Sequence, residues 1–181
     1  MKQTKLIILS TILFCTLIAV VFTSCEKSDF QYGPTTYYQP CEKVICLNGG
    51  SCLDGYCQCP LGFEGAQCSE RSSNKFEGTY HSYDDCNTTT GQFYVSSIVG
   101  DNNDATRLIL LNTSLFCSNF PVTAYLQKEK TSFTIPMQKA CGDLYISGNG
   151  NLNNNILNVF IQARDTFQHT TSQCSIIMNK Q

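Results

Sequence analysis

The stretch CEKVICLNGGSCLDGYCQCPLGFEGAQC, residues 41–68, places six cysteines close together in an otherwise polar segment. A segment this short cannot bury enough apolar surface to hold one shape, so cross-links have to stabilise it. Asn48-Gly49-Gly50 and Asp54-Gly55 are turn sequences, and they predict tight connections between short strands. The spacing alone leaves the pairing of the cysteines open.

Two features of this stretch resemble the EGF-like family. A single residue separates the fourth cysteine from the fifth, and the segment closes on Gly62-Phe63-Glu64-Gly65-Ala66-Gln67-Cys68. The resemblance implies an EGF-like domain over residues 41–69, used as a rigid spacer or a protein-binding unit. It implies that Phe63 packs against the last bridge and that Gly62 and Gly65 give the backbone freedom there. The implied pairs are Cys41–Cys52, Cys46–Cys57 and Cys59–Cys68.

EGF-like modules that bind calcium carry acidic and amide residues just before the first cysteine. Here Tyr37-Tyr38-Gln39-Pro40 occupies that place, so the carboxylates that a hard cation needs are missing. We therefore expect no calcium site. No Cys-x-x-Cys pair occurs in the chain, so the sequence predicts no zinc site either.

The N-terminus has the layout of an export signal. Lys2 and Lys5 precede a nearly continuous apolar run over residues 6–22. The run ends at Phe22-Thr23-Ser24-Cys25, which resembles the lipobox of bacterial lipoproteins. The resemblance implies removal of residues 1–24 and acylation of Cys25; an ordinary cleaved signal or an uncleaved anchor stays open. Residues 25–40 lack apolar periodicity and predict a flexible tether.

This layout predicts a protein anchored to the bacterial outer membrane by its lipid and facing the cell surface. The acidic start of the tether, Glu26-Lys27-Ser28-Asp29, resembles surface-export signals of some Gram-negative lipoproteins. The chain has 12 cysteines; apart from Cys15 and Cys25, the rest are even in number, as a disulfide framework requires. Disulfides persist outside the reducing cytosol, which agrees with export.

After a polar linker at residues 70–75, the pattern changes to short apolar runs separated by Asn, Asp, Gly and Thr. Alternation of period two predicts strands, and no segment shows helical periodicity. We expect residues 76–181 to form an antiparallel β-meander that closes into a barrel or a sandwich. The expected strands are Phe76–Ser82, Gln92–Val99, Arg107–Leu111, Val122–Gln127, Ser132–Pro136, Leu144–Leu152, Ile156–Gln162 and Gln173–Met178.

Four cysteines remain for this second domain. In a closed meander the first and last strands are neighbours, which favours Cys86–Cys174 and leaves Cys117–Cys141. The rival pairing, Cys86–Cys117 with Cys141–Cys174, requires other strands to be close. Phe76-Glu77-Gly78-Thr79-Tyr80 resembles the opening of small lipocalin-like domains of bacterial lipoproteins, with Tyr80 in place of the usual Trp. That resemblance implies a barrel.

Chemistry-bearing residues are sparse. The two histidines, His81 and His169, are expected to be exposed, and no nucleophile elbow or Ser–His–Asp order occurs. Asp84-Asp85 is explained by an Asp-rich turn. We therefore expect no enzyme, no cofactor and no metal. The formal net charge of −2 and the absence of a basic run give no electrostatic support for binding nucleic acid.

The leading hypothesis is a non-catalytic cell-surface binding protein with an EGF-like stalk and a β-rich head, and with an unknown protein or glycan partner. Loops at one end of the head, including residues 101–105 and 114–119, would form the contact surface. The alternative is a lipocalin-like carrier of a small apolar ligand, which needs an open apolar interior. A hydrolase with an unrecognised site is the third possibility.

Overall fold

The computed structural model describes residues 40–87, 89–113 and 120–181. The predicted signal peptide, the predicted acylation site Cys25 and nearly all of the predicted tether lie outside these ranges. Residues 39–181 form one compact unit. Within the described ranges, no helix has the length and the apolar character needed to cross a bilayer.

The first part of this unit is a small disulfide module, residues 40–71. It contains two short antiparallel pairs. The first pair turns at Asp54 and Gly55, both with positive φ, as the Asp-Gly sequence predicted. Its strands are β1 (Ser51–Leu53), β2 (Tyr56–Gln58), β3 (Phe63–Glu64) and β4 (Glu70–Arg71).

Three disulfides cross-link the module: Cys41–Cys52, Cys46–Cys57 and Cys59–Cys68. These are the pairs that the EGF-like resemblance implies. Cys68 is the one apolar side chain of the described module that is fully buried, while Ile45, Leu53 and Tyr56 are exposed. The module therefore has almost no apolar core, and its cross-links hold its shape.

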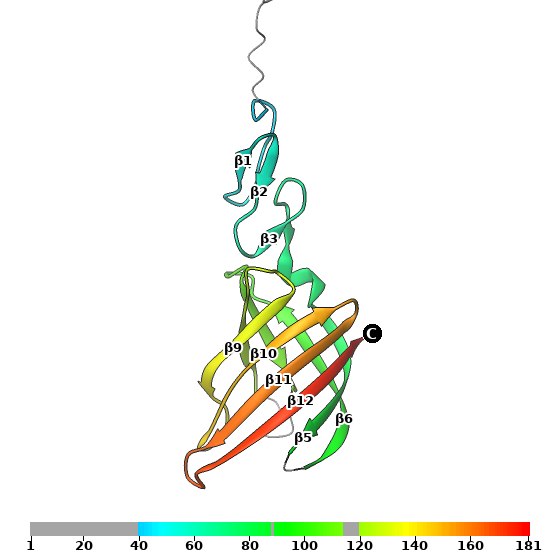
Figure 1. Cartoon of the computed structure of the whole chain (residues 1–181), viewed down its shortest axis with the longest axis vertical. Coiled ribbons are helices and arrows are strands. Elements are labelled where there is room, and N and C mark those ends of the chain that lie inside the picture. The colour runs from blue at the N-terminus through cyan, green and yellow to red at the C-terminus, as the bar shows by residue number, and fades with distance from the viewer. Residues whose placement is uncertain (1–39, 88, 114–119) are drawn as a thin grey trace, which may run out of the picture. The chain divides into compact units, whose positions relative to one another are not determined.

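The second part is a closed antiparallel barrel of eight strands, in which each strand pairs with the next along the chain (Figure 1). The last strand pairs with the first, so the sheet has no free edge. The expected meander is thus confirmed, as a barrel. The strands are β5 (Gly78–Cys86), β6 (Thr89–Gly100), β7 (Arg107–Leu111), β8 (Val122–Leu126), β9 (Ser132–Lys139), β10 (Leu144–Asn153), β11 (Ile156–Asp165) and β12 (Thr170–Lys180).

Cys86 and Cys174 lie directly opposite each other where β5 meets β12, and they form a disulfide. This pair excludes the rival pairing of the C-terminal cysteines. Cys141 is also disulfide-bonded; its expected partner, Cys117, lies outside the described residues. The bridge at Cys86 joins the first strand of the barrel covalently to the last.

The predicted linker, residues 70–75, is ordered. Glu70 and Arg71 form β4, which pairs with β3, and Ser72–Lys75 form a short 3-10 helix, η1. The backbone N–H of Ser72 donates to Gly62 O at 2.9 Å. The side chains of Ser72 and Ser73 are buried. The polar composition of residues 70–75 predicted an irregular linker. Their contacts with the disulfide module and with the barrel order them instead.

The side chains that fill the barrel interior differ between its two ends. We call the end that carries Gly78, Gly100 and Asn153 the proximal end, and the end that carries Cys86, Leu144 and Asp165 the distal end. Apolar side chains fill the proximal end: Phe76, Tyr80 and Phe133 are fully buried, and the rings of Phe76 and Phe133 meet edge to face at 5.7 Å. The Tyr80 hydroxyl donates to Phe76 O at 2.5 Å.

The barrel interior also contains a polar cluster of five residues, which begins at the level of Tyr80 and extends toward the distal end. Ser82 and Ser96 share a hydrogen bond of 2.5 Å, and the backbone N–H of Gln92 donates to Asp84 Oδ1 at 3.1 Å. The Tyr94 hydroxyl donates to Thr113 O at 2.8 Å. The members of the cluster are Ser82, Asp84, Tyr94, Ser96 and Thr113.

One seam of the barrel depends on a side chain. Strands β8 and β9 pair only at Tyr125–Thr134 and Leu126–Phe133. Farther toward the distal end, the Gln138 amide donates to Thr123 O at 2.8 Å and accepts from Thr123 N at 3.0 Å. The amide therefore replaces one rung of the backbone ladder. Pro136, which has no N–H to donate, lies in the same stretch of β9.

Candidate functional site

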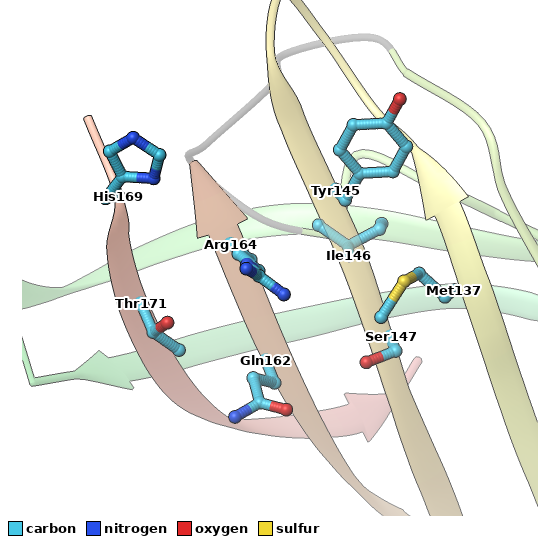
Figure 2. Close-up of a pocket in the computed structure, with 8 residues that line it drawn as sticks. All are labelled: Met137, Tyr145, Ile146, Ser147, Gln162, Arg164, His169 and Thr171. Atoms are coloured by element: carbon cyan, nitrogen blue, oxygen red, sulfur yellow. The ribbon is translucent and has the colours of Figure 1, made fainter. Parts of the chain in front are cut away.

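A groove crosses the outer face of β9 to β12 near the distal end of the barrel (Figure 2). Its volume is about 310 Å³, near the lower limit for sites that hold small ligands. We call it the β9–β12 groove. Its lining residues are Met137, Tyr145, Ile146, Ser147, Gln162, Arg164, His169 and Thr171.

Strand register explains why these side chains meet. Tyr145 on β10 lies opposite Arg164 on β11, and Arg164 lies opposite Thr171 on β12. Ser147 lies opposite Gln162 in a second cross-strand pair. Directly opposed residues share one face of a sheet. Because the apolar residues of β11 alternate inward, Gln162 and Arg164 point outward to the groove.

His169 is held at the rim by its turn. Asp165 Oδ1 accepts the backbone N–H groups of Phe167 and Gln168, at 2.9 and 2.8 Å. Thr166 donates from its N–H and its hydroxyl to Asp143 O, which ties this turn to the β9–β10 connection. His169 completes the turn with a φ of 56°. The position of His169 beside Arg164 therefore depends on the hydrogen bonds that order this turn.

The two histidines are not brought together. His169 lies in the turn just before β12, while His81 lies opposite Asn179 near the other end of that strand and contacts Gln181 Nε2 at 2.8 Å. Their positions along β12 differ by about 30 Å, at about 3.3 Å for each residue. Among the described residues, no cluster of three or more His, Cys, Asp and Glu side chains could hold a metal ion.

Asp84 and Asp85 lie on opposite faces of strand β5, not in the turn that their sequence predicted. Asp84 points into the barrel with no exposed surface, and its Oδ2 atom has no hydrogen-bond partner; Asp85 is exposed. Burial, and secondarily the charge of Asp84, raise the pKa of Tyr94. Burial raises the pKa of Tyr80 to about 12. An acid–base pair open to water does not form here.

The other predicted feature, the loop at residues 101–105, is occupied by internal contacts. Asp101 accepts from Asn103 N, pairs with Arg107, and accepts from Arg71 through its backbone oxygen. Hydrogen bonds from the Thr106 hydroxyl and N–H hold the pKa of Asp104 below its usual value. This loop is therefore a structural element that joins β4 to the barrel.

The expectation that residues 101–105 and 114–119 form one contact surface is wrong. The first loop follows the proximal end of β6, whereas β7 ends and β8 begins at the distal end. Successive connections of an antiparallel meander alternate between its ends. Residues 114–119 themselves lie outside the described ranges.

The disulfide module also touches the barrel. A Cβ added at Gly62 would lie 2.8 Å from the Ala105 side chain, and Gly62 has a φ of 93°. Both the close approach and the backbone conformation require glycine. The Lys130 ammonium donates to Phe63 O at 2.6 Å, and Lys75 pairs with Glu64 at 2.7 Å. Gly62, a residue of the predicted EGF motif, therefore also allows the module to pack closely against the barrel.

Comparison with known proteins supports the assignment of the module. The chain is 53% identical to protein eyes shut homolog of Danio rerio over 38 residues, 43% identical to pikachurin of Homo sapiens over 54, and 51% identical to lactadherin of Mus musculus over 35. Residues 41–68 form an EGF-like module. The matches cover 17% to 26% of this chain and only 1% to 8% of the relatives' lengths. No family model matches the chain.

Among solved structures, a redesigned β-barrel is similar to the chain with a TM-score of 0.42 and 10% sequence identity. The similarity covers 62% of this chain and 97% of that barrel. The β9–β12 groove was not predicted from the sequence. Its residues come from four strands, and only the register joins them; the alternation of outward polar residues on β10 and β11 was the available signal.

Proposed function

We propose that this protein is a non-catalytic binding protein displayed on the outside of a bacterial cell. Acylated Cys25 anchors it, the EGF-like module is its stalk, and the barrel is its head. The observation that carries the proposal is the β9–β12 groove: Arg164 and His169 line it, and the side chains of both make no hydrogen bond or ion pair within the described part of the chain. A cation left free in a concave site is available to a ligand.

Within the described residues no hydrogen bond joins His169 to a hydroxyl group of the groove, which favours binding over turnover. A hydrolase needs a nucleophile beside a base, or paired carboxylates open to substrate. The groove has hydroxyl, amide and cationic groups, but no carboxylate lines it. These groups can orient a ligand by hydrogen bonds and charge.

The carrier of an apolar ligand is the less favoured alternative. An apolar molecule inside the barrel would have to displace the rings of Phe76 and Phe133 or lie against the buried carboxylate of Asp84. The first choice loses packing, and the second surrounds a polar carboxyl group with hydrocarbon.

A first experiment tests the anchor. We expect the protein, expressed in a Gram-negative host, to begin at Cys25 with acyl chains in its intact mass, and to be cleaved by protease added to whole cells. Cys25→Ser should release it from the membrane, since stable attachment requires several acyl chains. Cys15→Ser, a cysteine within the apolar run, is the matched control and should stay anchored. A mature N-terminus elsewhere would contradict the anchor.

A second experiment tests binding through the head. The full chain is screened on arrays of glycans and extracellular proteins, and each retained ligand is recovered for mass analysis. We expect retention that Gln162→Trp, which fills the groove, abolishes, and a ligand of unchanged mass. The control is Asn158→Trp, at an exposed residue of the same strand that lies four positions nearer the proximal end and outside the groove lining. A chemically altered ligand, or retention that Gln162→Trp does not change, would reject the proposal.

A further inference from the structure

The groove has a distinctive order of charges. Tyr145 lies directly opposite Lys139 on β9 and directly opposite Arg164 on β11. One cross-strand row therefore reads cation, aromatic ring, cation, with Thr171 next to Arg164 at its end. Adjacent strands lie about 4.8 Å apart, so the backbones that carry the two cations are separated by about 10 Å.

Neither cation of this row is neutralised by the protein. The side chains of Lys139 and Arg164 make no hydrogen bond or ion pair within the ranges that the structure describes. The neighbouring carboxylate, Asp165, is engaged with two backbone N–H groups of its own turn. Asp143 is exposed in the β9–β10 turn, with no counter-charge assigned to it. The row therefore presents positive charge on a chain whose formal net charge is −2.

The groups around Arg164 are suited to a polyhydroxylated ligand. Figure 2 shows Arg164 between the rings of His169 and Tyr145, with Gln162 on the same strand and Ser147 and Thr171 on the adjacent strands. Hydroxyl and amide groups can each donate and accept hydrogen bonds with sugar hydroxyls. A guanidinium binds a carboxylate or sulfate through two parallel hydrogen bonds. An aromatic face packs against the C–H face of a sugar ring.

The same features disfavour a peptide. Extended peptides bind to β-proteins by adding a strand to an exposed edge, and this closed barrel has none. Met137 is the one exposed aliphatic side chain of the described lining, because Ile146 belongs to the buried core; the other six lining residues are polar, aromatic or cationic. Apolar side-chain pockets, which give peptide recognition its specificity, are missing from the described lining.

We propose that the β9–β12 groove binds an acidic saccharide, with Arg164 pairing with a carboxylate or sulfate and Tyr145 packing against the sugar ring. Lys139, about 10 Å away, takes the negative charge of the next acidic unit along the chain. The proposal rests on the proposed role of the barrel as a binding head, and it names the ligand class of that head.

The test uses the full-length protein in detergent and isothermal titration calorimetry. The probes are oligogalacturonate, which carries carboxylates; its methyl ester, which has the same sugars without charge; and dextran sulfate with neutral dextran. We expect oligogalacturonate or dextran sulfate to bind, the neutral partners to bind at least tenfold more weakly, and affinity to fall as salt is added. The charged probe that binds more tightly identifies carboxylate or sulfate as the recognised group.

Variants assign the binding to the groove. Arg164→Gln is expected to lower the affinity at least tenfold, and Arg164→Lys to recover only part of it, since an ammonium lacks the planar fork. Lys128→Gln removes an exposed cation from the β8–β9 turn and is the matched control for net charge. Tyr145→Ser should lower the affinity for the charged oligosaccharide. Inorganic sulfate, a further probe that has no sugar ring, should bind this variant and the unaltered protein equally.

Two results would overturn the proposal: neutral and charged probes binding equally, or Arg164→Gln behaving like Lys128→Gln. Failure of both charged saccharides also rejects it. If the array screen still retains another ligand through the groove, the binding function stands and only the ligand class is wrong. If Gln162→Trp changes nothing in that screen, the proposed function itself fails.

Discussion

The disulfide module and the barrel reach a defined shape by opposite means. The described module buries one apolar side chain fully, Cys68, and three disulfides cross-link it. The barrel buries a continuous apolar core that includes Phe76, Leu108, Phe133 and Ile161. Covalent restriction of the unfolded chain dominates in the first, and removal of apolar surface from water dominates in the second. The two parts should therefore respond to different perturbations.

Reduction of the disulfides is expected to give the largest difference between the module and the barrel. Each bridge of the module contributes about 2–4 kcal/mol, so losing three removes roughly 6–12 kcal/mol from a segment with no compensating core. Hydrogen exchange in reductant should show β1 and β2 exchanging as an unfolded chain while β10 and β11 stay protected. The Cys86→Ser/Cys174→Ser double variant, measured without reductant, shows how much the protection of the barrel depends on its own disulfide. A module that remains protected after reduction would contradict the comparison.

Truncating the barrel core should have the reverse effect. Phe133→Ala removes a fully buried ring that packs on Phe76, and we expect a loss of about 3–5 kcal/mol in the free energy of unfolding. Urea denaturation followed by circular dichroism measures it. Phe93→Ala, at a residue that is 84% exposed, is the control and should change little. Equal effects of the two substitutions would show that the core does not hold the barrel.

The stability of the protein at alkaline pH tests the same core through the buried phenol of Tyr80. The pKa of Tyr80 is raised to about 12 by burial, against about 10 in the unfolded chain. The unfolded state therefore releases this proton first, and stability present below pH 10 falls between pH 10 and 12 by roughly 2–3 kcal/mol.

Denaturation at pH 9 and pH 11 measures the first half of this loss, about 1 kcal/mol, which Tyr80→Phe should reduce. Tyr125→Phe, at a residue on the outer face of β8, should not reduce it. A wild-type protein equally stable at both pH values would exclude Tyr80 as a buried phenol.

The smallest expected effect is a gain in stability. Asp84 is buried, and its Oδ2 has no hydrogen-bond partner. Asp84→Asn keeps the acceptor for Gln92 N and replaces a buried carboxyl group that has one unpaired oxygen with a neutral amide, so it should stabilise the barrel by about 1–2 kcal/mol at neutral pH. Thermal unfolding of this variant is compared with that of Asp85→Asn, on the outer face. Destabilisation by Asp84→Asn would indicate that the carboxylate has a partner in the native protein.

Much of the fold was predictable because local patterns decide it. Each expected strand overlaps an observed one, and the range Arg107–Leu111 is the same in both. The alternation along β11 fixes which side chains face inward. The Cys86–Cys174 bridge followed from closure of the meander. What the pattern left open, barrel or sandwich, depends on long-range pairing of β12 with β5, which no local signal records.

The site was less predictable for the same reason. Arg164 and Tyr145 are separated by nineteen positions in the chain, and only the β10–β11 register makes them neighbours. His169 reads as an exposed residue in a Thr-rich stretch, and its position at the groove depends on the Asp165 turn. Conversely, residues 101–105 read as an open loop, but contacts with Arg71 and Arg107 occupy Asp101.

The covalent joint between Cys86 and Cys174 has a mechanical consequence. A load applied through the segment before Gly78 enters the barrel at the proximal end of β5 and peels that strand away from β6 and β12. After the nine residues of β5 have been released, further extension must drag Cys174, and with it β12, out of the sheet. The bridge therefore acts as a stop that keeps β9 to β11 assembled under tension.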